Sequence, residues 1–119
     1  MEWLKISTST ELVRVQTDDI VFVAADGNYS DIYLFDGKPL KMTFQLHYFD
    51  DVFQRLRANS FVRVGRGLIV NRNYINNINL TTQELRLNGT QLRSEFRLKA
   101  SREALKELKS LLEQEGDKA

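Results

Sequence analysis

Short apolar runs separated by turn residues place the strongest constraint on how this 119-residue chain folds. Branched and aromatic side chains dominate the runs, and such residues favour strands. The turn residues Asp26-Gly27-Asn28, Asp36-Gly37 and Asn88-Gly89 suit tight reversals, so neighbouring strands are expected to pair antiparallel, with Asn88-Gly89 as the strongest hairpin signal. The predicted strands cover residues 3–6, 12–15, 20–25, 29–35, 39–44, 61–64, 68–71, 75–79, 84–87 and 91–98.

Two segments show helical periodicity instead. Apolar residues recur at three- and four-residue intervals from Leu46 to Leu56, and Thr43 is the expected N-cap of this helix, which should end near Arg57. Ser101 is expected to cap a final helix that carries a stripe of leucines. The sequence therefore predicts a mostly β fold with a short internal helix and a C-terminal helix.

Size and composition predict one folded domain. Hydrophobic residues make up 42% of the chain, charged residues 28%, and there is one proline, as in an ordinary globular domain. We expect a single domain over residues 1–115 and a frayed tail at 116–119, where nothing apolar can be buried. With no cysteine, no secretory signal and no long apolar stretch, the chain is expected to be cytoplasmic and to have no membrane association.

The sequence offers little for catalysis. His47 is the only histidine and cysteine is absent, so these residue types supply neither a metal site nor a nucleophile–base pair. The neighbouring carboxylates of Asp18-Asp19 and Asp50-Asp51 should point apart on regular structure, and the glycines do not form a phosphate-binding P-loop. We therefore expect no enzymatic activity, no catalytic residues, no metal and no cofactor.

Charge is distributed unevenly along the chain. Residues 1–51 hold four Lys/Arg against nine Asp/Glu, a net charge of −5, whereas residues 52–119 hold thirteen against seven, a net charge of +6. No acidic residue lies between Val52 and Gln83, although five arginines do. This pattern predicts either a basic surface for nucleic acid or a solvated face that pairs with the acids of the first half.

The densest group of distinctive residues lies between Phe61 and Ile75. Arg66 stands between Gly65 and Gly67, with predicted strands on both sides. An arginine on such a tight turn can approach a surface closely and fork onto a phosphate or a guanine edge. Arg63 lies within a strand, where a DNA contact and an internal ion pair are both open.

Several motifs follow one another in order along the chain. The strand Ile20–Ala25 precedes the turn Gly27-Asn28-Tyr29, a helix begins near Thr43, and Ser101-Arg102 precede the last helix. Between them lies a pattern of the form Phe-x-Arg-x-x-Arg-x-x-x-Val-Asn with an isoleucine further on, formed by Phe61, Arg63, Arg66, Val70, Asn71 and Ile75. Together these motifs resemble the LytTR family, the DNA-binding domain of many bacterial response regulators, over nearly the whole chain.

The resemblance implies an elongated stack of three small antiparallel sheets, with about ten strands in all. It implies that loops rather than a recognition helix enter successive major grooves and that the duplex is bent. Tyr29, with its neighbours Asn28 and Ser30, corresponds to the first loop, Arg66 to the second and Arg102 to the third. Candidates for non-specific phosphate contact are Arg72, Arg97 and Lys99. The full set of implied DNA-binding residues is Asn28, Tyr29, Ser30, Arg63, Arg66, Arg72, Ser101 and Arg102.

Two of these residues also have a purely structural interpretation. Tyr29 at the start of a strand is commonly a packing residue, and Arg102 can simply face solvent on the last helix. Asn71 is expected to hydrogen-bond the local backbone rather than a base. Gly65 and Gly67 stand where the family usually has histidine and serine, so two side chains that could donate to DNA are missing, although backbone amides could replace some phosphate contacts.

The resemblance implies a transcriptional regulator that binds promoter repeats in double-stranded DNA, with a homodimer on DNA and a receiver domain as further partners. It would act as the output domain of a two-component response regulator or alone. One alternative is a protein-interaction or homodimerisation module without DNA affinity, using the leucine stripe Leu105, Leu108 and Leu112. Another is a hydrolase that uses the paired carboxylates.

Overall fold

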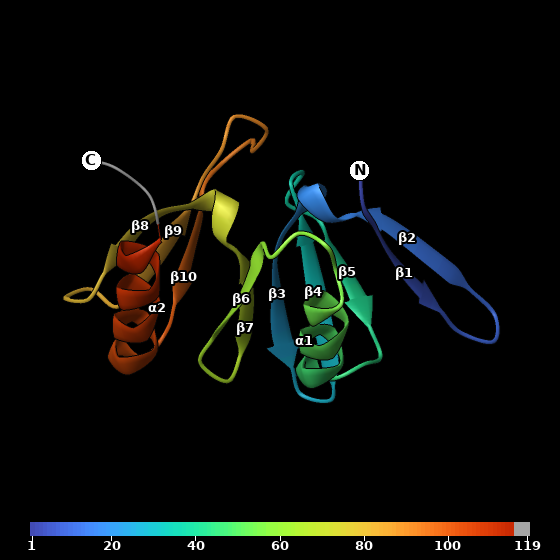
Figure 1. Cartoon of the computed structure of the whole chain (residues 1–119). Coiled ribbons are helices and arrows are strands. Elements are labelled where there is room, and N and C mark those ends of the chain that lie inside the picture. Colours follow the sequence, from blue (N-terminus) through green and yellow to red (C-terminus); the bar gives the residue numbers. More distant parts are fainter. Residues whose placement is uncertain (116–119) are drawn as a thin grey trace.

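The structure, a computed structural model, describes residues 1–115 and is mostly β (Figure 1). Ten strands and two α-helices are present in these residues, which confirms the predicted fold class. The expected frayed tail at 116–119 lies outside the described residues. The elements are β1 (Trp3–Ser7), β2 (Leu12–Gln16), β3 (Ile20–Asp26), β4 (Tyr29–Leu34), β5 (Pro39–Met42), α1 (Leu46–Gln54), β6 (Phe61–Val64), β7 (Leu68–Asn71), β8 (Ile75–Asn79), β9 (Glu84–Leu87), β10 (Phe96–Lys99) and α2 (Arg102–Gln114).

The strands form three antiparallel sheets that stand in a row. A two-stranded sheet holds β1 and β2, a five-stranded sheet has the order β5-β4-β3-β7-β6, and a three-stranded sheet has the order β10-β9-β8. The molecule measures 46 × 31 × 28 Å, so the expected elongated stack of three sheets is confirmed. Figure 1 shows α1 beside the five-stranded sheet and α2 beside the three-stranded sheet.

Strand β3 is the centre of the fold because it contributes to two apolar clusters. Ile20 and Val23 pack with β1, β2 and α1, whereas Val21 and Phe22 pack with β9 and α2. The pairing of β3 with β4 shifts between Ile20 and Phe22, as in a β-bulge. Alternation along a strand supplies both faces of the sheet, and the bulge interrupts it so that the consecutive residues Val21 and Phe22 join the same cluster.

The two helices use their apolar faces inside the fold. Phe49 of α1 is fully buried, and so is Leu105 of α2. Leu108 is 3% exposed, and Leu112 packs against the same cluster. The leucine stripe that the interaction-module alternative relied on is therefore mostly core in the isolated chain.

The internal helix begins two residues later than the sequence indicated. Its N-cap is Gln45 and not Thr43, and no side chain caps it. The ring of Phe44 stacks on Tyr48 at a centroid distance of 4.2 Å, and the Phe44 carbonyl accepts a hydrogen bond from Ser30. These contacts hold the chain outside the helix until Gln45, so the predicted cap is wrong.

The predicted tight hairpin at Asn88-Gly89 is also wrong. Strands β9 and β10 do pair antiparallel, but residues 88–95 connect them and β10 begins only at Phe96. The Asn88 amide donates to the Tyr74 carbonyl at 2.8 Å, and a side chain on Gly89 would lie 3.1 Å from the Tyr74 ring. Asn88 therefore continues the pairing of β9 with the chain before β8, and the chain reverses later, where the Leu92 amide donates to the Gly89 carbonyl at 3.1 Å.

Two predicted side-chain hydrogen bonds to the backbone are present in the structure. Ser101 caps α2 by accepting a hydrogen bond from the Ala104 amide at 3.1 Å, as predicted. Asn71 is buried and donates to the Ile20 carbonyl while accepting from the Asn73 amide, so its backbone role is confirmed. No helix in residues 1–115 is long and apolar enough to span a membrane.

Candidate nucleic-acid interface

Three connections and the start of α1 lie along one edge of the molecule. Strand β3 is antiparallel to both β4 and β7, so the β3–β4 and β6–β7 turns share an edge, and the Ala25 amide donates to the Gly67 carbonyl at 2.9 Å. The β10–α2 junction adjoins this edge because Ser101 lines a cleft together with Arg66. Figure 1 shows these turns along the lower edge. We call residues 26–29, 45–47, 65–67 and 101–102 the loop edge.

Arg66 occupies the tip of the β6–β7 turn. Val64 pairs with Leu68, which leaves only Gly65, Arg66 and Gly67 in the connection. Gly65 has a φ of 62°, a conformation that glycine adopts without strain. Arg66 is exposed, and within residues 1–115 its guanidinium has neither a hydrogen bond nor an ion pair.

Arg63, in contrast, is exposed but has partners within the protein. Its Nη1 atom lies 3.0 Å from Oδ2 of Asp50 on α1, in an ion pair. Its Nε atom donates to the Gly65 carbonyl at 2.9 Å, and its Nη2 atom donates to the Arg66 carbonyl at 3.0 Å. Of the two interpretations left open by the sequence, the internal ion pair is present in the structure.

The β3–β4 turn carries neutral polar groups at its tip. Asn28 is exposed, and its Oδ1 accepts a hydrogen bond from Nε2 of Gln45 at 3.1 Å. Tyr29 is 47% exposed, which leaves much of its ring available to a partner. Ser30 is fully buried, and its hydroxyl donates to the Phe44 carbonyl at 2.8 Å. Ser30 is therefore not available to a partner, whereas Asn28 and Tyr29 are.

Acidic groups lie next to this turn. Nζ of Lys41 on β5 is 2.8 Å from Asp26 and 3.0 Å from Asp31. Hydrogen bonds to Asp26 and then to Asp31 raise the pKa of Lys41 above its ordinary value. Lys41 also lies over the Tyr29 ring, 5.8 Å from its centroid. One lysine thus neutralises part of the charge of two carboxylates on this side of the loop edge.

The β10–α2 junction places one further arginine on the loop edge. Arg102 is the first residue of α2 and is exposed, and its guanidinium has no hydrogen bond or ion pair in the described part of the chain. The Ser101 hydroxyl is used as the helix cap. Lys99, a weaker candidate for phosphate contact, donates to the Thr82 carbonyl at 3.1 Å.

Arg72 is not brought to the loop edge. It follows β7, at the opposite end of that strand from Arg66. Its side chain is 19% exposed and forms an ion pair with Glu115 at the end of α2. Arg97 likewise pairs with Glu95, at 2.8 Å, and this hydrogen bond raises the pKa of Arg97. Both arginines already have partners within the protein.

A family model for the LytTr DNA-binding domain matches residues 10–113. The chain belongs to the LytTR family. This match covers most of the chain and includes all three connections of the loop edge. Members of this family are DNA-binding domains, which is the class of function that the sequence motifs indicated.

One solved structure supports the assignment of the fold. It is the LytTr DNA-binding domain of a Bacillus cereus protein described as a methyl-accepting/DNA response regulator. The similarity has a TM-score of 0.67 and a sequence identity of 19%, and it covers 94% of this chain and 97% of that one. At this identity the likeness shows a shared LytTR fold. No match was found among curated proteins.

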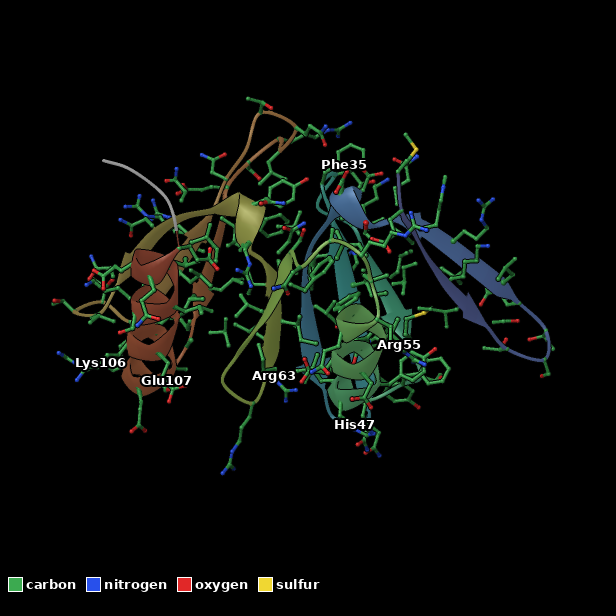
Figure 2. All side chains as sticks on the ribbon, in the orientation of Figure 1. Phe35, His47, Arg55, Arg63, Lys106 and Glu107 are labelled. Atoms are coloured by element: carbon green, nitrogen blue, oxygen red, sulfur yellow. The ribbon has the colours of Figure 1, made fainter. Side chains whose placement is uncertain are left out.

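Sequence reasoning missed the start of α1 as part of this LytTR surface. Gln45 contacts Asn28 directly, and Figure 2 shows His47 at the lower end of α1. The sequence alone assigned His47 neither a catalytic nor a DNA-binding role. A signal was nevertheless present: antiparallel strands alternate in direction, so the end of β5 returns to the edge where β4 begins.

Proposed function

We propose that this LytTR domain binds double-stranded DNA sequence-specifically through the loop edge and regulates transcription. The observation that carries the proposal is Arg66, an exposed guanidinium without an internal partner on a glycine-flanked turn. Arg102 stands nearby on the junction that lines the same cleft. Two available arginines on one edge of a DNA-binding fold suit contact with phosphates and guanine edges.

The proposed roles differ among the residues of the loop edge. Arg66 would enter a major groove and read a base or hold a phosphate, and Arg102 would contact the next stretch of backbone. Asn28 and Tyr29 would contact the duplex through neutral hydrogen bonds and packing. Ser101 would contribute indirectly, because it caps the helix that begins with Arg102. Arg72 has no part in this proposal, because Glu115 occupies its guanidinium.

The biological setting follows from the same proposal. The domain would act in the cytoplasm on repeats in promoter DNA, with bending of the duplex contributing to sequence preference. A second copy bound to the neighbouring repeat and a receiver domain are the protein partners we propose. The interaction-module alternative has lost its main support, since Leu105 and Leu108 lie in the core. The hydrolase alternative has no observation in its favour, and Asp50 is paired with Arg63.

Selection of duplexes from a random pool, followed by a binding titration, tests this function. The selected duplex should bind more tightly than a scrambled one, and its affinity should fall steeply with added salt because bound counterions are released. Arg66→Ala should weaken binding by roughly tenfold, or about 1.4 kcal/mol, in the lower part of the range of about 1–3 kcal/mol for one arginine contact. No salt-dependent binding, or unchanged affinity in the variant, would contradict the proposal.

A further inference from the structure

The guanidinium of Arg63 is anchored on three sides. Two of its nitrogens donate to consecutive carbonyls of the β6–β7 turn, at 2.9 Å to Gly65 and 3.0 Å to Arg66. The third contact is the 3.0 Å ion pair with Asp50. Figure 2 shows Arg63 between the turn and α1. The turn is therefore tied by one side chain to a helix that packs in the core.

These contacts require an arginine in particular. A guanidinium presents donors in a fixed planar fork, whereas an ammonium is a compact charge on a flexible stem. The carbonyls of a three-residue turn have few partners inside the sheet, and Arg63 satisfies two of them. Asp50 in turn balances the charge and fixes the guanidinium plane. The result is a turn whose backbone is set before any ligand arrives.

We propose that Arg63 is a positioning residue for DNA binding, which holds the β6–β7 turn so that Arg66 projects from it in one orientation. Three of its five N–H donors are already used within the protein, and we assign its effect to the turn rather than to a contact of its own with the duplex. Preorganisation of this kind improves affinity by reducing the ordering that binding must otherwise impose. The inference rests on the proposed DNA-binding function.

A charge-conserving substitution separates positioning from direct contact. Arg63→Lys keeps the positive charge but cannot bind both carbonyls and Asp50 together. We expect it to lose about tenfold in affinity for the selected duplex, close to the loss in Arg63→Gln. Arg55→Gln is the matched control, because Arg55 is exposed just after the far end of α1 and should bind as the unaltered chain does. Wild-type affinity in Arg63→Lys would overturn the inference.

A double-mutant cycle tests whether Arg63 acts through Arg66. If it does, adding Arg63→Gln to Arg66→Ala should change the affinity by less than about twofold, because the oriented side chain is already gone. Additive losses would show an independent contact and would overturn the inference while leaving the DNA-binding function standing. If the unaltered chain shows no salt-dependent binding, the proposed function fails first, and the inference with it.

A measurement without DNA checks the geometry even if a variant folds poorly. In the unaltered chain, the Nε proton of Arg63 should exchange with solvent at least about tenfold more slowly than the Nε proton of Arg66, because only the former is hydrogen-bonded. NMR of the arginine side chains gives both rates in one sample. Equal exchange rates would mean that Arg63 does not hold the turn, and would overturn the inference.

Discussion

The β3–β4 and β6–β7 turns share one edge but differ in charge. The first has Asp26 and Asp31 beside it, with Lys41 between them, and presents the neutral side chains of Asn28 and Tyr29. The second presents Arg66, and its own backbone carbonyls are bound by a second arginine. The difference indicates a division of labour in which the β6–β7 turn supplies electrostatic attraction and the β3–β4 turn supplies neutral contacts.

Charge reversal on the β6–β7 turn should have the largest effect. Arg66→Glu is expected to lower DNA affinity by about 100-fold or more, since it removes a contact and adds repulsion from the phosphates. Fluorescence anisotropy with a labelled selected duplex measures this directly. Arg55→Glu makes the same charge change away from the loop edge and should cost far less. Equal losses in the two variants would mean that only net charge is important.

Within the β6–β7 turn, alanine should destabilise the fold only where φ is positive. Gly65→Ala is expected to destabilise the fold by about 1–2 kcal/mol, because φ there is 62°. Gly67→Ala is the matched control: its φ is not in the left-handed region, and nothing lies within 4 Å of an added Cβ atom. Urea unfolding of both variants gives the comparison. A loss in Gly67→Ala as large as in Gly65→Ala would refute this explanation of the turn.

Removal of an acid from the β3–β4 turn should act in the opposite direction to the loss of Arg66. Asp26→Asn is expected to raise DNA affinity about two- to threefold at low salt, because it removes repulsion and frees Lys41, and the gain should fade at high salt. Asp36→Asn in the β4–β5 turn, at the other end of β4, should leave affinity unchanged. A lower affinity in Asp26→Asn would instead assign Asp26 a direct contact or a structural role.

The smallest effect expected concerns the stability of the β3–β4 region at alkaline pH. Since Asp26 and Asp31 raise the pKa of Lys41, its ion pairs should be fully present below pH 10.5 and lost as the pH rises through the raised value. The difference in Tm between the unaltered chain and Lys41→Gln should therefore be slight below pH 10.5 and shrink above it. A difference that is constant across this range would count against the ion pairs.

The sequence predicted the fold well because its signals are local and agree with one another. The apolar run of β3, the glycine turns beside it and the Ser101 cap each lead to the structure that forms. The errors arose where distant residues decide the outcome. The contact of Asn88 with Tyr74 places the reversal of the chain beyond Asn88-Gly89, and the hydrogen bond from Ser30 to the Phe44 carbonyl helps to keep Phe44 outside α1.

The candidate site could be predicted only in part. The exposed positions of Arg66 and Arg102 follow from turn and helix-start signals close to them in sequence. The burial of Ser30 and the pairing of Arg72 with Glu115 depend on contacts between separate elements. The same is true of Arg63, whose partner Asp50 lies on α1. A single sequence does not specify which carboxylate will meet which arginine.

An NMR titration of the isotopically labelled chain with the selected duplex tests the central claim most directly. The account predicts saturable shifts concentrated at the amides of residues 27–29, 65–67 and 101–102, with the largest at the β6–β7 turn. Residues 88–95 and the β4–β5 turn at Asp36-Gly37 should remain nearly unchanged. Shifts concentrated on those segments, with none on the loop edge, would contradict the account.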